Sequence, residues 1–349
     1  MSSIKEVAKH AGISSASVSI YLNNKETKRV SSKTKERIEL AVKDLNYHKN
    51  VFASSLSTQK SKLIGIIIPT MLPLFNNDFT NTLLSGIQTR LSSFGYGLLF
   101  FPSSADTSIK IVKEQLEKSA GCDGYILFST GFCTMKQIMK NITEVQKTQR
   151  PFVTLNIPHV EDAVNQVLIQ DLDTSTGVRY LIKRGHRKIL LLLGRSSGEH
   201  AKFLKKDFQY IMENHKLDFS EDKILYGDYS AEESYTKVKA ALQKFPDTTA
   251  ICCMSDIMAS STLQAIADTG KSVPEDISVI GRNNTLYSRL SYPALSTIDL
   301  HMHQAGLSSA NLLLDALNGG TGTQKILLSG SLIERDSVRT FGRKNVNEN

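Results

Sequence analysis

The feature that most constrains the fold is a series of short apolar runs between residues 63 and 281, separated by stretches of helical periodicity. The runs are LIGIIIP, YGLLFFP, GYILFS, PFVTLN, KILLLLG, AICCMSD and ISVIG. Continuous apolar runs that alternate with helices are typical of parallel strands covered on both faces. They form two successive sets, divided near residues 160–169. The sequence therefore predicts two α/β subdomains with a ligand cleft at the facing strand ends.

Length and composition narrow the class of protein. A chain of 349 residues exceeds the size at which a single core stops growing, so two or more domains are expected. There is no run of twenty apolar residues and no apolar leader after the first methionine, which favours a soluble cytoplasmic protein without a membrane segment. The four cysteines lack CxxC spacing, so we expect reduced structural thiols and no metal site.

The first two dozen residues carry the pattern of two short helices joined by a sharp turn. Ser3 and Glu6 form a capping box for the first helix, and Gly12 can end it because glycine accepts a left-handed backbone. Ser14 can cap the second helix, which turns Val18 inward. This is a helix-turn-helix, whose second helix enters a DNA major groove. An ordinary helical hairpin with a small core is the alternative.

Charge favours the DNA-binding interpretation. Residues 1–62 hold twelve Lys and Arg against five Asp and Glu, a net charge of +7, whereas the whole chain carries +8. A basic segment on a near-neutral body is suited to a phosphate backbone, because each neutralised phosphate releases a condensed counterion. A third helix is expected to start at Ser31 or Ser32 and to bury Ile38 and Ala41, which completes a three-helix bundle.

Several long stretches resemble the lac repressor family of bacterial regulators (LacI/GalR). In the first fifty residues these are IKEVAKHAGIS, SVSIYLNN, VSSKTKERI and LNY. Further along they are ASSL, LIGIIIP, LIKRGHRKI, VPEDISVIG and PALSTI. The resemblance implies a small all-α helix-turn-helix domain, a hinge helix, and a periplasmic-binding-protein-like α/β core of two doubly wound subdomains.

The resemblance also implies domain boundaries and partners. The DNA-binding domain would span residues 1–48, the hinge helix and linker 49–61, and the effector-binding and dimerisation core 62–349. Three crossovers would divide the core into an N-subdomain at about 62–162 and 294–322 and a C-subdomain at about 163–293 and 323–340. Family members are homodimers on a pseudo-palindromic double-stranded DNA operator. They mostly repress genes of carbohydrate uptake or catabolism and are switched by a small-molecule effector.

DNA-binding residues follow from the resemblance position by position. They are Ser14, Ser15, Ala16, Ser17, Ser19, Ile20, Asn23, Lys28, Arg29, Asn50, Ser54 and Leu56. Leu56 matches a leucine that wedges into the minor groove at the operator centre, with packing on its own domain as the alternative. Family members commonly have a guanine-reading arginine where this chain has Ile20, which offers only apolar contact, for instance to a thymine methyl. We therefore expect an operator richer in A·T at that position.

Effector-binding residues follow in the same way and are Asn77, Phe79, Asn156, Asp256, Arg282 and Asn283. Asp256 matches the family's cleft aspartate, with a helix N-cap as the alternative. The usual GFDD or GYDD is GRNN here, so an amide replaces a carboxylate and Arg282 stands beside it. Leu204 and Asp207 stand where sugar-binding relatives often have arginine and glycine. The added cation favours a sugar phosphate or sugar acid, unless Arg282 is a salt-bridged surface residue.

Two other classes of function compete with this interpretation. An enzyme would need a catalytic signature, but the chain has no GxSxG, no GxxxxGK[ST] and no paired carboxylates, so we expect no catalytic residues and no cofactor. A regulator controlled by a protein partner of the phosphocarrier type, with a vestigial effector cleft, is the main alternative, because several cleft residues depart from the family pattern.

Overall fold

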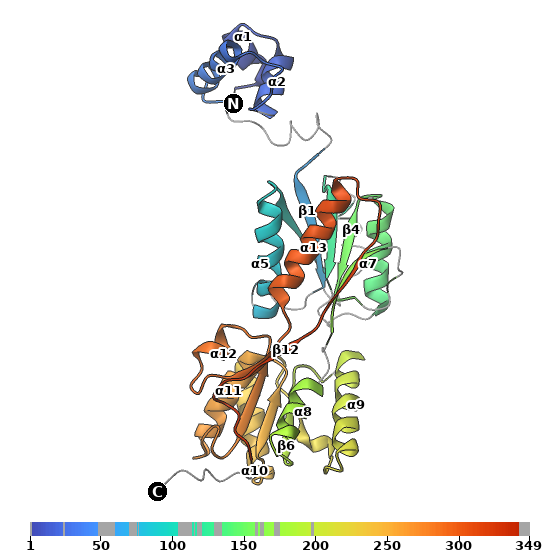
Figure 1. Ribbon diagram of the computed structural model, residues 1–349, viewed down its shortest axis with the longest axis vertical. Helices are drawn as coiled ribbons and strands as arrows, with labels where there is room; N and C mark the ends of the chain where they lie inside the picture. Colours follow the sequence, from blue (N-terminus) through green and yellow to red (C-terminus); the bar gives the residue numbers. More distant parts are fainter. Residues whose placement is uncertain are drawn as a thin grey trace. The chain divides into compact units, whose positions relative to one another are not determined.

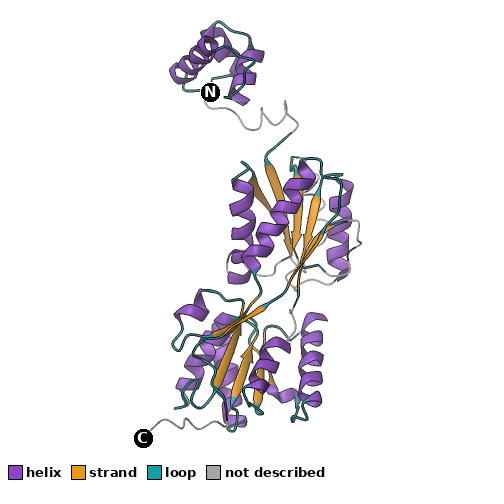
Figure 2. Ribbon diagram, viewed as in Figure 1, coloured by secondary structure: helices purple, strands orange, loops and turns teal. Residues whose placement is uncertain are grey.

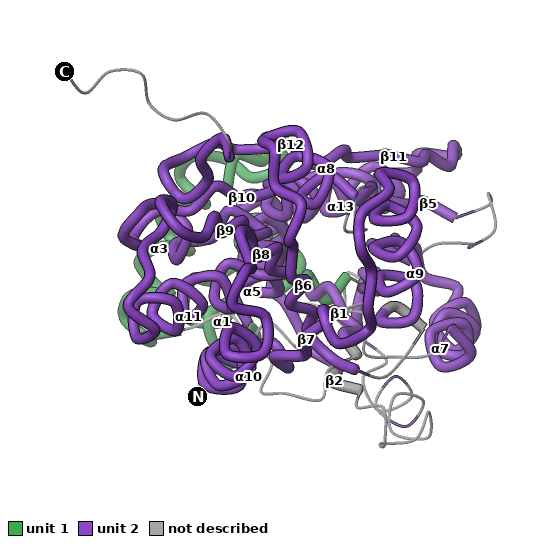
Figure 3. The backbone as a smooth tube through the Cα atoms, turned by 90° about the horizontal axis from the view of Figure 1, so that it is seen from below, with its two compact units in different colours: residues 1–62 green, residues 63–349 purple. Residues whose placement is uncertain are grey.

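The computed structural model describes residues 2–23, 25–47, 60–69, 75, 77–103, 114, 116, 121–128, 135–157, 160, 164–170, 175–196 and 199–341. The chain divides between Lys62 and Leu63 into two compact units, which we call the head and the core (Figure 3). The expected DNA contacts Asn50, Ser54 and Leu56, with most of the expected hinge helix, lie outside the described residues. No helix in the described part of the chain is long and apolar enough to cross a membrane.

Three helices form the head: α1 (Ile4–Ala11), α2 (Ser15–Asn23) and α3 (Ser32–Asp44) (Figure 1). The capping box is confirmed, because the Ser3 amide donates to the Glu6 carboxylate and the Glu6 amide donates to Ser3 Oγ. Gly12 follows α1 with a φ of 61°, which a residue with a side chain rarely adopts. Ser31 caps α3, since its Oγ accepts from the Thr34 amide at 3.3 Å. The local signals in the sequence thus set the helix ends.

The interior of the head is small and closely packed. Val18 and Ile38 are fully buried, and Ala8 and Ala41 lie in the same cluster. Tyr21, which the sequence pattern did not single out, is also buried and donates its hydroxyl hydrogen to Glu39. Because Val18 and Tyr21 both face this interior, the opposite side of α2 is left to solvent.

The first core subdomain is built on a six-stranded sheet in the order β11-β5-β4-β3-β1-β2, with every pair parallel. Its strands are β1 (Leu63–Pro69), β2 (Gly97–Ser103), β3 (Gly124–Phe128), β4 (Phe152–Leu155), β5 (Asn165–Ile169) and β11 (Lys325–Leu328). Helices cover both faces (Figure 2). They are α5 (Asp78–Ser92) and α13 (Met302–Leu317) on one face and α7 (Met135–Lys147) on the other. Successive residues such as Ile66 and Ile67 belong to hydrophobic clusters on opposite faces of the sheet, as a strand buried on both faces requires.

The second core subdomain repeats this architecture in the order β12-β10-β9-β8-β6-β7. Its strands are β6 (Ile189–Leu193), β7 (Ile224–Tyr226), β8 (Ala250–Cys253), β9 (Ser278–Arg282), β10 (Ser296–Asp299) and β12 (Ser331–Ile333). Its helices are α8 (Ser175–Lys183), α9 (Glu199–Asn214), α10 (Ala231–Lys244), α11 (Asp256–Ala267) and α12 (Leu286–Leu290), with a 3₁₀ turn at Glu221–Lys223. Only β12, paired with β10, runs antiparallel among the described strands of this sheet.

All seven apolar runs that the sequence predicted as strands form strands in the two sheets.

The three crossings between the subdomains lie further along the chain than the expected boundaries near 163, 294 and 323. β5 pairs with β4 in the first sheet, β10 pairs with β9 in the second, and β11 pairs with β5 in the first. The chain therefore crosses after β5, between β10 and α13, and between β11 and β12. These strands are short and partly polar, so an apolar pattern does not reveal which sheet holds them.

Candidate functional site

The solvent face of α2 carries the residues expected to contact DNA. Ser15, Ala16, Ile20 and Asn23 are exposed, while Ser17 and Ser19 are half-buried at its margin. Ile20 keeps 36% of its surface exposed, so its side chain is accessible on this face of α2. Ser14, also exposed, accepts the Ser17 amide hydrogen on its Oγ at 3.2 Å and so caps the helix.

Lys28 and Arg29 project from the turn between α2 and α3, and both are exposed. Their neighbours Thr27 and Val30 are buried at 9% and 7% exposure, which anchors the turn on the head interior. The Arg29 amide donates to Thr27 Oγ1 at 3.3 Å. Two cations on an anchored turn beside an exposed helix face suit phosphate oxygens, with the helix free to approach base edges.

A cluster of charged and aromatic side chains lies at the carboxyl edge of the second sheet. Arg195 follows β6, and its Nε lies 3.2 Å from Oδ1 of Asp228, which follows β7. Tyr229 comes next with a φ of 56°. A Cβ on Gly194 would lie 2.0 Å from the Tyr229 ring, so the ring packs directly on the backbone at the end of β6. Sequence reasoning missed these residues because β7 is only three residues long; the polar GDYS after it was the available signal.

Arg282 is the last residue of β9 and only 5% exposed, so it is not the surface residue of the alternative interpretation. Its charge acts on neighbours at the same edge. Burial raises the pKa of Cys252 to about 12, an effect that Arg282 opposes and Asp207 adds to. Burial also raises the pKa of Tyr229, whereas the positive charges of Arg282 and Arg195 lower it. The sheet edge therefore holds both cations and carboxylates close to one aromatic ring.

Asp256 is fully buried and engaged by two other segments of the chain. Its Oδ2 accepts from the Thr285 amide at 2.6 Å and from the Thr285 hydroxyl at 3.1 Å. Its Oδ1 accepts from the Thr297 hydroxyl at 2.6 Å. Burial raises its pKa to about 6, opposed by these hydrogen bonds. The N-cap of α11 is Ser255, so the alternative in which Asp256 caps the helix is wrong. The Asp256 carboxylate instead connects α11 to β10 and to the start of α12.

Asn283 and Asn284 continue this edge with left-handed backbones, at φ of 95° and 50°. The Asn283 amide donates to the carbonyl of Ile298 at 2.8 Å, which extends the pairing of β9 with β10. The side chain of Asn284 donates from Nδ2 to Asp299 at 2.9 Å and accepts from Arg335 at 2.7 Å. Asn283 is half-buried beside Arg282, in keeping with its expected place at the strand end.

The other three expected effector residues lie at the carboxyl edge of the first sheet. Asn77 caps α5, with its Oδ1 accepting from the Thr80 amide at 3.2 Å. Phe79 stacks on Phe128 at the end of β3, with 5.9 Å between ring centroids. Asn156 follows β4 with a φ of 55°. The six expected residues therefore divide equally between the two sheet edges, three on each.

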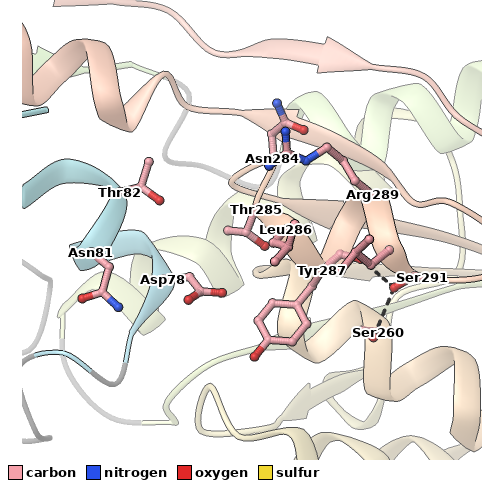
Figure 4. A pocket seen from close by; sticks show the side chains of 11 residues that line it. Asp78, Asn81, Thr82, Ser260, Asn284, Thr285, Leu286, Tyr287, Arg289 and Ser291 are labelled. Carbon is pink, nitrogen blue, oxygen red and sulfur yellow. Dashed lines mark hydrogen bonds between the residues drawn. The ribbon is translucent and has the colours of Figure 1, made fainter. Parts of the chain in front are cut away.

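The core has two cavities among its described residues. One of about 520 Å³ is lined by Asp78, Asn81 and Thr82 from α5, by Ser260, and by residues 284–287 and 289–291 (Figure 4). The other, of about 510 Å³, runs along α5 and β2. Neither is lined by an expected effector residue. Among the described residues, no group of three or more His, Cys, Asp or Glu side chains is placed to hold a metal ion.

Known protein families match both the head and the core of the chain. The model for bacterial regulatory proteins of the lacI family matches residues 3–50, and that for the periplasmic binding protein-like domain matches residues 178–338. The HTH-type transcriptional repressor PurR of Histophilus somni (strain 129Pt) is 29% identical over 347 residues, covering 98% of this chain and 100% of PurR. PurR of Haemophilus influenzae (strain PittEE) is 28% identical over 353 residues, with coverage of 98% and 100%.

Solved structures share the fold. The lac repressor dimer bound to operator and the anti-inducer ONPF has a TM-score of 0.81 at 24% identity, covering 97% of this chain and 99% of that one. A LacI family regulator from Enterococcus faecium with bound ribose has a TM-score of 0.66 at 23% identity, with coverage of 80% and 99%. With its helix-turn-helix head and its core of two parallel sheets, the chain belongs to the lac repressor family of bacterial regulatory proteins.

Proposed function

We propose that this protein is a sequence-specific DNA-binding transcriptional repressor whose operator affinity is switched by a small molecule bound in the core. The observation that carries the proposal is the solvent face of α2 on a head of net charge +7. The relatives named above are transcriptional repressors, and the lac repressor structure is bound to its operator. None of these relatives is an enzyme, and nothing in the described residues favours control by a phosphocarrier partner.

The operator is proposed to be pseudo-palindromic, with Ile20 at a base edge and Lys28 and Arg29 on phosphates. Asn50, Ser54 and Leu56 remain predicted contacts near the operator centre. Selection of binding sites from random double-stranded DNA tests this directly. Two inverted half-sites with an A·T pair opposite Ile20 are expected, because isoleucine offers only apolar contact to a base edge. Recovery of unrelated sequences without symmetry would contradict it.

A homodimer is proposed on the basis of an exposed apolar surface beside the larger cavity. Its large side chains are Leu286, Tyr287, Leu290 and Tyr292, exposed at 57%, 40%, 74% and 97%. Contiguous apolar surface of this kind is uncommon on monomers and marks an interaction site. A two-fold symmetric operator also requires two heads. Light scattering is expected to give a dimer for the wild type and a monomer for Leu290→Asp. Met139→Asp, at an exposed apolar position on α7, is the matched control and is expected to stay dimeric.

The effector is proposed to bind at the carboxyl edges of the two core sheets, where ligands of open α/β sheets bind. Arg282 and Asn283 supply hydrogen-bond donors at the second edge, and the Tyr229 ring supplies an apolar face. The ligand class is proposed to be polar, with hydroxyl or anionic groups. A thermal shift screen of sugars, sugar phosphates and purines tests it. Arg282→Leu is expected to abolish the shift from any ligand that the wild type binds, and an unchanged shift would place the site elsewhere.

A further inference from the structure

The chain crosses between the two core subdomains at three places, two of which, before α13 and before β12, can be followed in Figure 1. The first crossing begins at Gln170, directly after β5. The second is residues 300–301, between β10 and α13. The third is residues 329–330, between β11 and β12. A movement of one subdomain against the other has to be absorbed at these few residues, since the sheets themselves are rigid.

Side-chain hydrogen bonds connect the region of the third crossing to each of the other two crossings. Ser329 Oγ donates to Gln170 Oε1 at 2.8 Å, which links the third crossing to the first. Ser331, the first residue of β12 directly after the third crossing, has its Oγ 3.2 Å from His301 Nε2 at the second crossing. The Gln170 amide also donates to the carbonyl of Leu328 at 2.7 Å. The first of these bonds joins residues that are 159 positions apart in the sequence.

His301 is held in a specific orientation at the second crossing. Its backbone is left-handed, with a φ of 54°, and its amide donates to Asp299 Oδ1 at 2.7 Å. The same oxygen lies 3.7 Å from His301 Nδ1, which leaves Nε2 directed at Ser331. His301 makes no side-chain cap on α13, so its ring is not serving the helix end.

Both sides of this crossing are firmly attached to their own subdomain. A Cβ on Gly86 would lie 2.1 Å from the carbonyl oxygen of His303, so α13 packs on α5 at backbone contact. On the other side, Asp299 accepts from Asn284 at 2.9 Å, next to Asn283 at the candidate effector edge. The crossing thus connects a rigid helix pair to the strand end where we place the ligand.

We propose that Gln170, His301, Ser329 and Ser331 form a latch that ties the three crossings together, so that the core subdomains turn about one shared axis. His301 is its central positioning residue. The latch itself does not depend on the proposed function. Its connection to an effector, through Asp299 and Asn284, does rest on that function.

Hydrogen exchange with mass spectrometry on the full-length protein, without any ligand, tests the latch. In Ser331→Ala, amides in the 298–304 segment are expected to exchange several-fold and up to about tenfold faster, although the substitution lies elsewhere in the sequence. In Gln170→Ala the same increase is expected around residues 327–331. An increase confined to the segment that carries each substitution would overturn the proposal.

A second variant and a control separate the latch from general loosening. His301→Asn keeps a residue that tolerates a left-handed backbone but is too short to reach Ser331, so it is expected to raise exchange around residues 329–333. Ser93→Ala, which removes a hydroxyl bonded to the Arg90 carbonyl at the end of α5, is expected to leave all three crossings unchanged. Operator selectivity of the wild type is measured separately, so a failure of the repressor assignment would leave the exchange result standing.

Discussion

The head and the core assemble their candidate sites in opposite ways. In the head, the residues that orient α2 are close in sequence: Ser14 caps through Ser17, and Val18 packs inward one position later. In the core, Asp256 bonds to Thr285 and Thr297, which lie 29 and 41 positions away. The head's site therefore depends on local helix signals, whereas the core's site exists only when strands that are distant in the sequence have paired in the two sheets.

Charge separates the two units in the same way. The head carries +7 of the chain's net +8, so the core is close to neutral and its charges can balance locally. Arg195 with Asp228 is one such pair. This difference indicates a division of labour in which the head supplies affinity for a polyanion and the core supplies a small polar site.

The largest expected effect comes from Ile38→Ala in the head. Ile38 is fully buried in a cluster of eight buried residues. Removing it costs about 2–5 kcal/mol, which is most of the stability of so small a domain. We expect the head to unfold and operator affinity to fall about a hundredfold or more, while the calorimetric midpoint of the core stays unchanged. A common shift of both transitions would show that the two units are not independent.

In the core, Asp256→Ala is expected to have the next largest effect. It leaves the Thr285 amide and two threonine hydroxyls without their acceptor in a buried site. Each such group costs about 1–3 kcal/mol, so the free energy of unfolding of the core should fall by about 3 kcal/mol or more in urea titrations. Asp256→Asn keeps one acceptor and is expected to lose less. Equal losses for both variants would contradict a hydrogen-bonding role.

The pH dependence of core stability depends on two buried groups with opposite signs. Burial lowers the pKa of His186 from 6.5 to about 4, so its contribution is lost as the pH falls through that interval. Burial raises the pKa of Asp256 from 3.8 to about 6, so its contribution is present at low pH and lost as the pH rises. Each titration changes the free energy of unfolding of the core by at most about 3 kcal/mol. His186→Gln should therefore lose less stability than the wild-type core when the pH is lowered from 7 to 4. Asp256→Asn should lose more than the wild-type core over the same range. Thermal melts between pH 4 and 7 that show the reverse order would refute this.

A smaller effect is expected on DNA specificity from Ile20→Arg. An arginine fork donates hydrogen bonds to guanine O6 and N7, which discriminates bases by about 1–3 kcal/mol. Operators selected with this variant should gain a guanine at one position in each half-site. Ile20→Val keeps an apolar contact and is the matched control, whose selected sites should resemble those of the wild type.

The smallest expected effect is that of Lys28→Ala. One lost phosphate contact should lower the slope of log affinity against log salt by about one, with no change in the preferred sequence. Lys136→Ala, at an exposed position on α7 in the core, is the control and should leave the slope unchanged. A change in sequence preference would place Lys28 at a base edge instead.

The contrast between the units also explains what sequence could predict. The capping box at Ser3 and the turn at Gly12 depend on neighbouring residues, so the head's helices were predicted closely. The apolar runs revealed seven core strands but not the short strands β5, β7, β10, β11 and β12, whose sheet membership is set by long-range pairing. Tyr229 was missed because its position depends on contact with Gly194, far away in the sequence.

Fluorescence anisotropy of the full-length protein on its selected operator tests whether the protein is a repressor switched by a small molecule. The titration is made at several salt concentrations, alone and with a panel of sugars, sugar phosphates and purines. We expect tight, sequence-selective binding that one of these metabolites strengthens or weakens. Weak binding that is equally sensitive to salt on every sequence would contradict it, because the solvent face of α2 would then read no bases.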